Sequence, residues 1–219
     1  FSFNGHKRAD RFIGDYHFTF TNKEIVDSRV LNSRIKWMLE VFKRERGFLP
    51  DHILITRDGV SEGQHQYLLD ELDALREGAA DFLISADFFS LFAVLLQKEY
   101  KPRLTFVLAT KRHNHRFLQN GESTFTNAPP GTVVDTVVTR PEMTSFFLQA
   151  HYPLQGTAKS TAYRVIADDY GYKMDELQAF VNALCFEHQV STGAISIPAP
   201  IYQADEWAKR GYDNFKYYR

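Results

Sequence analysis

Apolar residues recur along the chain at spacings that predict alternating strands and helices. Helical spacing places Leu31, Ile35, Met38 and Phe42 on one face between Val30 and Phe42, and Gly47 and Pro50 then end that helix. The same spacing predicts two more helices, one with Leu68, Leu72 and Leu75 and one with Met174, Leu177, Val181 and Leu184. Strand-like runs cover Phe12–Phe20, Ile53–Ile55, Leu104–Ala109, Val133–Val138 and Tyr163–Ala167. Strands that alternate with helices predict an α/β domain.

Composition narrows the class of protein. The 219 residues are 44% hydrophobic and 15% aromatic, which is enough for the core of one sizeable domain or two small ones. No run predicts a membrane span or a secretory leader, since even the most apolar stretch, Asp81–Leu96, carries two aspartates. The single Cys185 excludes an internal disulfide framework and suits a reducing compartment. A net charge of −1 means that any site for a polyanion must be a local patch.

Asp58 is the first candidate for chemistry. It follows a short apolar strand, precedes Gly59, and is followed by Ser61, where a second helix opens. A carboxylate at the C-terminal end of a strand faces the crevice where α/β sheets bind ligands, and hard divalent cations prefer such oxygen ligands. The alternative interpretation is an Asp-Gly turn with Ser61 as the helix cap.

The segment Lys101–Arg116 is the second candidate because it contains no acid and is strongly basic. Such a loop after a strand is able to neutralise phosphates, and the alternative is a solvated charged loop. A metal site at His113 and His115 is the weaker hypothesis, since no cysteine or third histidine accompanies them. The basic residues are Lys101, Arg103, Lys111, Arg112 and Arg116.

The tail Ile195–Arg210 is the third candidate. Its prolines stop any strand and permit a helix to start, which places Asp205 and Glu206 early in that helix and Lys209 later. The alternative interpretation is that these charges only complement the helix dipole.

Taken together, these motifs resemble one family. RDGVSEGQ (Arg57–Gln64), KRHNHR (Lys111–Arg116), PPGTVVD (Pro129–Asp135), LQGTAKSTAYRVIADD (Leu154–Asp169) and SIPAPIYQADEWAKR (Ser196–Arg210) appear in the order of the Argonaute PIWI domain. The resemblance runs from about Phe12 to Tyr212 and implies an RNase H-like fold, a mixed central sheet flanked by helices. It also implies a protein that binds a small guide RNA and cuts the complementary target RNA, with silencing-complex proteins as further partners and a cytoplasmic, or also nuclear, location.

The resemblance implies a tetrad of acids that works with two Mg²⁺ (or Mn²⁺) ions. Matched residue by residue, Asp58 and Asp205 would be metal ligands, and Glu24 in KEIV is the candidate for the glutamate that closes in as a loop reorders. Glu24 is equally interpretable as an ordinary acid in a first helical turn. The remaining aspartate is expected on a strand before Phe1, so we expect residues 1–219 to be a partial PIWI domain that lacks its first strand and its C-terminal tail. Alone, this piece is expected not to cut RNA.

The resemblance also assigns contacts to the guide backbone. The matched positions are Lys111, Arg112, Arg116, His151, Lys159, Ser196, Tyr202 and Arg210. The chain departs from the family where arginines that precede SIPAP are replaced by Val190 and Gly193, and where Asp81–Leu96 is longer and more apolar. Two functions therefore stay open: a guide-directed endoribonuclease, and a guide-binding silencer that recruits partners without cutting. A DNA nuclease of the same fold fits the KRH and SIPAP motifs poorly.

Overall fold

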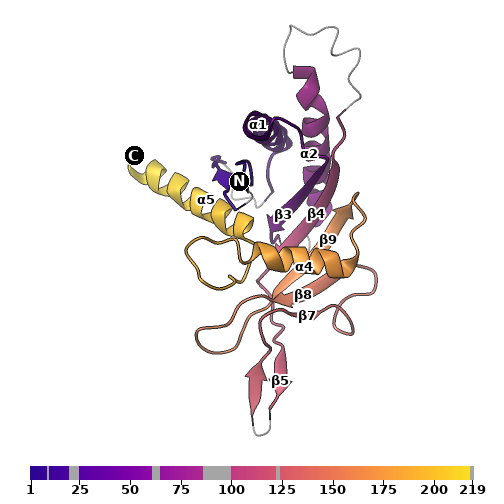
Figure 1. Cartoon of the computed structure of the whole chain (residues 1–219), viewed down its shortest axis with the longest axis vertical. Helices are drawn as coiled ribbons and strands as arrows, with labels where there is room; N and C mark the ends of the chain where they lie inside the picture. Colours follow the sequence, from indigo (N-terminus) through magenta and orange to yellow (C-terminus); the bar gives the residue numbers. More distant parts are fainter. Residues whose placement is uncertain (9, 20–24, 61–64, 86–99, 122–123, 218–219) are drawn as a thin grey trace.

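The computed structural model is built on one mixed five-stranded sheet (Figure 1). It describes residues 1–8, 10–19, 25–60, 65–85, 100–121 and 124–217. The strand order is β3-β4-β9-β8-β7; β3 and β4 are parallel and the other neighbours are antiparallel. The expectation of a mixed central sheet flanked by helices is confirmed. The strands are β3 (His52–Asp58), β4 (Arg103–Thr110), β9 (Thr161–Asp168), β8 (Ser145–Gln149) and β7 (Thr132–Val134).

The helices begin and end where local sequence directs. Asp27 caps α1 (Ser28–Arg46) by accepting a hydrogen bond from the Arg29 amide, and Gly47 ends it in the left-handed region at φ 82°. The predicted second helix is α2 (His65–Ser85), and the predicted third is α4 (Met174–Leu184). The tail forms α5 (Ala199–Tyr217) directly after Pro198, as the prolines predict.

Strand β4 shows how the sheet divides the core into two layers. Leu104, Phe106 and Leu108 point to one face, where they pack with Leu68 and Leu72 of α2. On the opposite face the β4 residues that pack beneath α4 and the start of α5 belong to a cluster that includes Tyr163 and Cys185. A bulge between Phe106 and Val107 interrupts the β4–β9 ladder. Helix α1 contacts α2. Because α2 packs on one face of the sheet and α4 with the start of α5 on the other, helices cover both faces.

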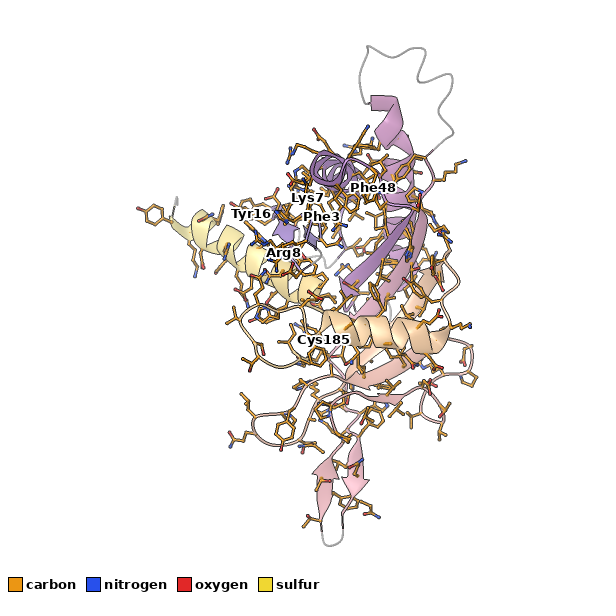
Figure 2. The ribbon with its side chains drawn as sticks, viewed as in Figure 1. Phe3, Lys7, Arg8, Tyr16, Phe48 and Cys185 are labelled. Atoms are coloured by element: carbon orange, nitrogen blue, oxygen red, sulfur yellow. The ribbon has the colours of Figure 1, made fainter. Side chains whose placement is uncertain are left out.

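The N-terminal segment differs from the predicted strand Phe12–Phe20. Only Ile13–Gly14 is extended and paired (β2, with β1 at Ser2–Phe3), and residues 15–19 form no strand; Phe20 lies outside the described residues. The aromatic side chains here pack on helix α5 instead of joining a ladder. The Tyr16 ring fits against Gly211, where any added Cβ would collide with it, and Phe18 contacts Phe215. In Figure 2 the labelled Tyr16 and Phe3 lie between α1 and α5.

Other sequence expectations need smaller corrections. Strand β7 ends at Val134 rather than Val138, and Val137 adopts a positive φ of 66° that no strand tolerates. Periodicity missed β8 and the hairpin of β5 (Leu118–Asn120) and β6 (Phe125–Asn127). The apolar stretch Asp81–Leu96 begins as the last turn of α2, and its residues 86–96 lie outside the described part of the chain. Within the described residues, no helix is long and apolar enough to cross a membrane.

Candidate nucleic-acid interface

Four of the residues predicted to bind RNA come together where loops meet at one end of the sheet. We call Lys111, His151, Lys159 and Ser196 the loop cluster. The Lys111 ammonium donates a hydrogen bond to the Ser196 hydroxyl. Burial lowers the pKa of Lys111, and the nearby charge of Lys159 lowers it further. Burial also lowers the pKa of His151, and the charge of Lys111 adds to that effect. Two lysines and a histidine from three loops therefore lie close to one another.

Each of these residues lies within a few positions of the end of a strand or the start of a strand or helix. Lys111 follows β4 directly, His151 comes two residues after β8, Lys159 precedes β9, and Ser196 precedes α5. The antiparallel pairing of β9 with both β4 and β8 brings the end of β4, the end of β8 and the start of β9 to the same end of the sheet. The sheet order thus gathers residues that are as far as 85 positions apart in the sequence.

The remaining basic residues of the KRH loop have different neighbours. Arg112 is exposed, and Arg116 donates from Nη1 to the carbonyls of His113 and His115, at 3.2 and 2.7 Å. His113 lies 2.8 Å from the Ser160 carbonyl through Nε2, and His115 packs on Phe147. In the described part of the chain no third ligand converges on these histidines, so the structure gives no support to a metal site there.

Tyr202 and Arg210 lie on α5. Tyr202 packs against His188, with ring centroids 4.4 Å apart, in the loop that leads from α4 to the SIPAP motif. The Arg210 guanidinium lies over the Trp207 ring, 5.1 Å from its centroid, and its side chain is exposed. The same loop carries Val190 and Gly193, both exposed, at positions where an arginine was expected from the resemblance.

The predicted acids lie on two elements that contact each other. Asp58 is the exposed last residue of β3, and its Oδ1 accepts a hydrogen bond from the Gly59 amide at 2.8 Å. Asp205 lies in the second turn of α5, a helix that has no acid in its first turn, so the helix dipole does not account for it. Helix α5 packs against β3. Glu24 lies outside the described residues, and Ser61 does too.

The chemistry of these acids fits a hard cation, although Lys209 already pairs with one of them, Asp205. Carboxylate oxygens at an exposed strand end and helix face are ligands that Mg²⁺ prefers. Asp205 is 57% exposed and its Oδ2 lies 2.8 Å from Lys209 Nζ, which also pairs with Glu206. Among the described residues no group of three metal-ligating side chains is assembled, and the third predicted acid is not among them. The metal therefore stays a prediction.

Comparison with known proteins decides the family. The Piwi domain family model matches residues 1–216. This chain belongs to the Piwi domain family. The Argonaute protein wago-1 of Caenorhabditis elegans is 35% identical to it over 208 residues, 92% of this chain and 20% of that protein. Protein argonaute 5 of Arabidopsis thaliana is 38% identical over 74% of this chain and 16% of its own length. This Piwi domain thus spans about a fifth of the curated relatives it matches.

Solved structures agree with the Piwi fold. Kluyveromyces polysporus Argonaute, determined with a guide RNA, superposes with a TM-score of 0.75 at 28% identity, over 89% of this chain and 23% of that one. The C-terminal lobe of a budding yeast Argonaute gives a TM-score of 0.72 at 28% identity, over 84% of this chain and 37% of that one. The Argonaute and Piwi resemblance stated from the sequence motifs is therefore confirmed.

Among the buried polar groups of this Piwi domain that sequence reasoning missed, two lie beside the candidate sites. Glu71 on α2 is 3% exposed and pairs with Arg57 next to Asp58, and Gln149 at the end of β8 is 2% exposed beneath the loop cluster. Glu71 stands on a helix of otherwise ordinary amphipathic pattern, and Gln149 ends the run Phe146-Phe147-Leu148. A polar residue that closes a continuous apolar run is the one signal that would have indicated Gln149.

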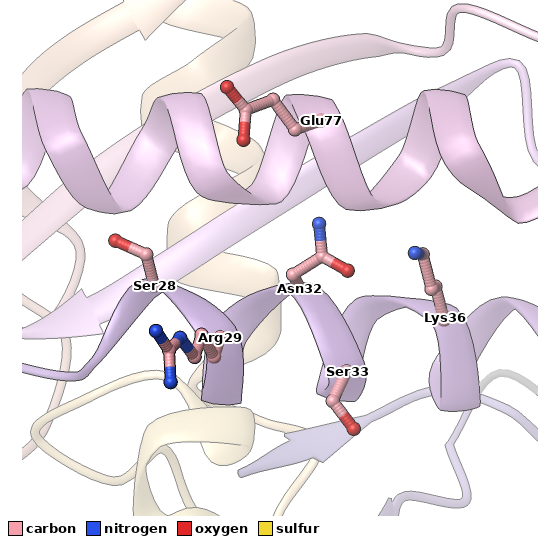
Figure 3. A pocket seen from close by; sticks show the side chains of 6 residues that line it. All are labelled: Ser28, Arg29, Asn32, Ser33, Lys36 and Glu77. Carbon is pink, nitrogen blue, oxygen red and sulfur yellow. The ribbon is translucent and has the colours of Figure 1, made fainter.

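A separate pocket of about 450 Å³ lies between α1 and α2 of the Piwi domain (Figure 3). Its lining mixes charges, and one of its cations, Lys36, already pairs with Asp81 at 3.3 Å. Neither Asp58 nor Asp205 nor any member of the loop cluster lines it, so it is not part of the proposed interface. The lining residues are Ser28, Arg29, Asn32, Ser33, Lys36 and Glu77.

Proposed function

We propose that this Piwi domain holds the sugar-phosphate backbone of a small guide RNA for gene silencing, and that the loop cluster is a principal contact. The observation that carries the proposal is the convergence of Lys111, His151 and Lys159 from three separate loops. The ammonium groups of Lys111 and Lys159 repel each other, and no acid belongs to the cluster, so a polyanion relieves that repulsion.

The surroundings of the cluster favour phosphate. Burial lowers the pKa of Lys111, and the charge of Lys159 adds to that effect, so a bound phosphodiester would favour the charged form of Lys111 again. Burial also lowers the pKa of His151, and the neutral ring that this favours offers an N–H donor to a phosphate oxygen. The Ser196 hydroxyl, already held by Lys111, offers a neutral donor to a phosphate oxygen. These contacts read the backbone and not the bases, as a guide of variable sequence requires.

Direct binding measurements test this proposal. The affinity of the chain for a 5′-phosphorylated single-stranded RNA is measured for the wild type and for the Lys111→Ala, Lys159→Ala double variant. Each lost phosphate contact is worth roughly fivefold at physiological salt through counterion release, so the pair should weaken binding by about an order of magnitude or more. The matched control is Lys43→Ala, an exposed lysine on α1 outside the cluster. Equal affinity in the double variant and the wild type would contradict guide binding by the loop cluster.

We further propose that the intact protein cuts target RNA, and contact between α5 and β3 supports it, because these elements carry Asp205 and Asp58. Two divalent cations bound there would supply Lewis acidity and a water of lowered pKa. Asp58 and Asp205 would ligate them, and Glu24 would complete the ligands. Lys209 would leave the Asp205 carboxylate, which is an exposed and therefore weak pairing.

The cleavage proposal is tested in a full-length Argonaute whose Piwi domain is this chain. Asp58→Asn and Asp205→Asn should each abolish Mg²⁺-dependent, guide-directed cleavage while guide binding stays intact, because an amide does not replace a carboxylate ligand. A wild type that binds guide without cutting would instead establish the second candidate, a silencer that acts through partners. Cleavage that survives both substitutions would refute these two residues as ligands.

A further inference from the structure

A fully buried glutamine lies directly beneath the loop cluster. Gln149 ends β8 and is 2% exposed. Its Nε2 donates to the His151 carbonyl at 2.6 Å and lies 3.5 Å from His151 Nδ1. Its Oε1 accepts from the Ser160 hydroxyl at 2.9 Å. A carbonyl only accepts, so the amide nitrogen must face His151, and the orientation of the amide follows from its partners.

Ser160 extends this connection to the neighbouring loops. It is 3% exposed and directly follows Lys159. Its hydroxyl is held by Gln149, while its carbonyl lies 2.8 Å from Nε2 of His113 in the KRH loop. The Gln149 amide therefore ties the loop that carries His151 to the segment that carries Lys159. The Ser160 carbonyl joins the same segment to the KRH loop.

A second buried residue connects the remaining member of the cluster. Thr161 is fully buried, and its hydroxyl donates to the Ser196 carbonyl at 2.6 Å. Ser196 in turn accepts from Lys111. Thr161 thus holds Ser196, and through Ser196 it is linked to Lys111.

We infer that Gln149, together with Ser160, is a positioning residue that presents His151 and Lys159 to the RNA backbone; the inference rests on the proposed function of the loop cluster. The amide fixes the carbonyl of His151 and directs a donor toward its Nδ1. A neutral imidazole that accepts at Nδ1 carries its proton on Nε2, which leaves Nε2–H as the donor for a phosphate oxygen. A buried amide is costly to leave unpaired, so the Gln149 side chain favours the orientation in which both of its ends have partners.

A purely structural role for Gln149 makes a different prediction. If the amide only filled the core, the unbranched apolar Gln149→Met of similar size would alter stability and leave RNA binding unchanged. If it positions the cluster, Gln149→Met should weaken binding of 5′-phosphorylated single-stranded RNA by about tenfold, the equivalent of one hydrogen bond to a charged group. His151→Ala should then cost much less in the Gln149→Met background than in the wild type, because two residues that act through one contact are not additive.

The experiment measures RNA affinity for Gln149→Met, His151→Ala and the double variant, together with the tautomer of His151 from long-range ¹⁵N–¹H correlations. We expect non-additive losses and a wild-type Nε2–H tautomer that becomes a mixture in Gln149→Met. Additive losses, an RNA affinity of Gln149→Met within twofold of the wild type, or an unchanged His151 tautomer in Gln149→Met would each overturn the inference. Ser160→Ala is the second variant: should Gln149→Met not fold, loss of RNA affinity in Ser160→Ala supports the positioning role and wild-type affinity refutes it.

Failure of the inference and failure of the proposed function are distinguishable. The Lys111→Ala, Lys159→Ala double variant removes charge from the cluster itself. If that variant binds RNA as well as the wild type, the proposed function fails. If it binds weakly while Gln149→Met binds normally, only the positioning role is wrong.

Discussion

Arg57 and Glu71 form an ion pair that joins the strand carrying Asp58 to helix α2. Arg57 Nε lies 3.1 Å from Glu71 Oε2, and Nη2 lies 3.3 Å from Oε1. Glu71 Oε1 also accepts from the Val26 amide at 3.1 Å, and Arg57 Nη1 donates to the Asp58 carbonyl at 2.9 Å. One buried carboxylate therefore holds the end of β3 and the segment that enters α1.

Removal of that carboxylate should destabilise the fold strongly. Glu71→Ala removes the carboxylate that pairs with Arg57 and accepts from the Val26 amide. The expected loss in the free energy of unfolding is about 3 kcal/mol, the lower end for breaking a buried pair, because the Arg57 side chain is 23% exposed. Denaturant unfolding measures it. Asp73→Ala breaks the exposed Asp73–Arg76 pair on the same helix and should cost no more than about 1 kcal/mol. Similar losses in the two variants would argue against a special role for Glu71.

Lys209 should compete with divalent cations for Asp205. Its ammonium lies 2.8 Å from the Asp205 carboxylate, so Lys209→Ala removes a positive charge that a metal ion would have to displace. We expect Mn²⁺ to bind more tightly to this variant, as measured by paramagnetic broadening of amide resonances near Asp58 and Asp205. Lys216→Ala, on the same helix but placed over the Tyr212 ring, is the matched control and should change nothing. Unchanged Mn²⁺ affinity in Lys209→Ala would count against Asp205 as a ligand.

Salt dependence should identify which cations contact phosphate. Alanine at Lys111, Arg112, Lys159 or Arg210 should reduce the slope of log affinity against log salt by about 0.7 to 1 each. Lys111 and Lys159 belong to the loop cluster, whereas a contact of Arg112 or Arg210 with RNA would have to be made from an exposed position. Titrations of RNA binding at several salt concentrations give the slopes. Wild-type slopes in all four variants would show that these charges are only solvated.

Stability should fall as the solution is acidified from pH 7.5 to 5.5. Burial lowers the pKa values of His52, His113 and His151, so the folded chain resists protonation more than the unfolded chain does. The unfolded state then binds more protons below about pH 6.5, and the free energy of unfolding decreases as pH falls. Unfolding midpoints at a series of pH values test this. His151→Asn should flatten the decrease, while the same change at the exposed His17 should not. A pH-independent wild type would contradict the burial of these rings.

Local patterns anticipated the elements whose signals are short-range. The spacing of Met174, Leu177, Val181 and Leu184 coincides with α4, and Gly47 ends α1 as expected. The strand Leu104–Ala109 lies within β4. These succeed because one amphipathic face or one left-handed residue is enough to define the element.

The failures fall where long-range packing overrides local preference. Tyr16 and Phe18 have the aromatic alternation of a strand, yet α5 lies close enough for their rings to pack on it. The β8 run is buried almost throughout, so it lacks the alternation that would have revealed it. Its position after an apolar strand made Asp58 a candidate, but only resemblance to a family assigned Asp58 and Asp205 as metal ligands, since an Asp-Gly turn is as ordinary in a surface loop as in a metal site.

By itself the sequence determined the family, the α/β class and the identity of the basic and acidic side chains, because motifs and periodicity are local properties. Only the tertiary structure decided that Lys111, His151, Lys159 and Ser196 meet, since the pairing of β9 with β4 and β8 brings their loops to one end of the sheet. It also decided that Gln149 and Glu71 are buried. Strand order and loop convergence depend on contacts between distant segments, and the period of hydrophobic residues carries no information about which distant segment a side chain will meet.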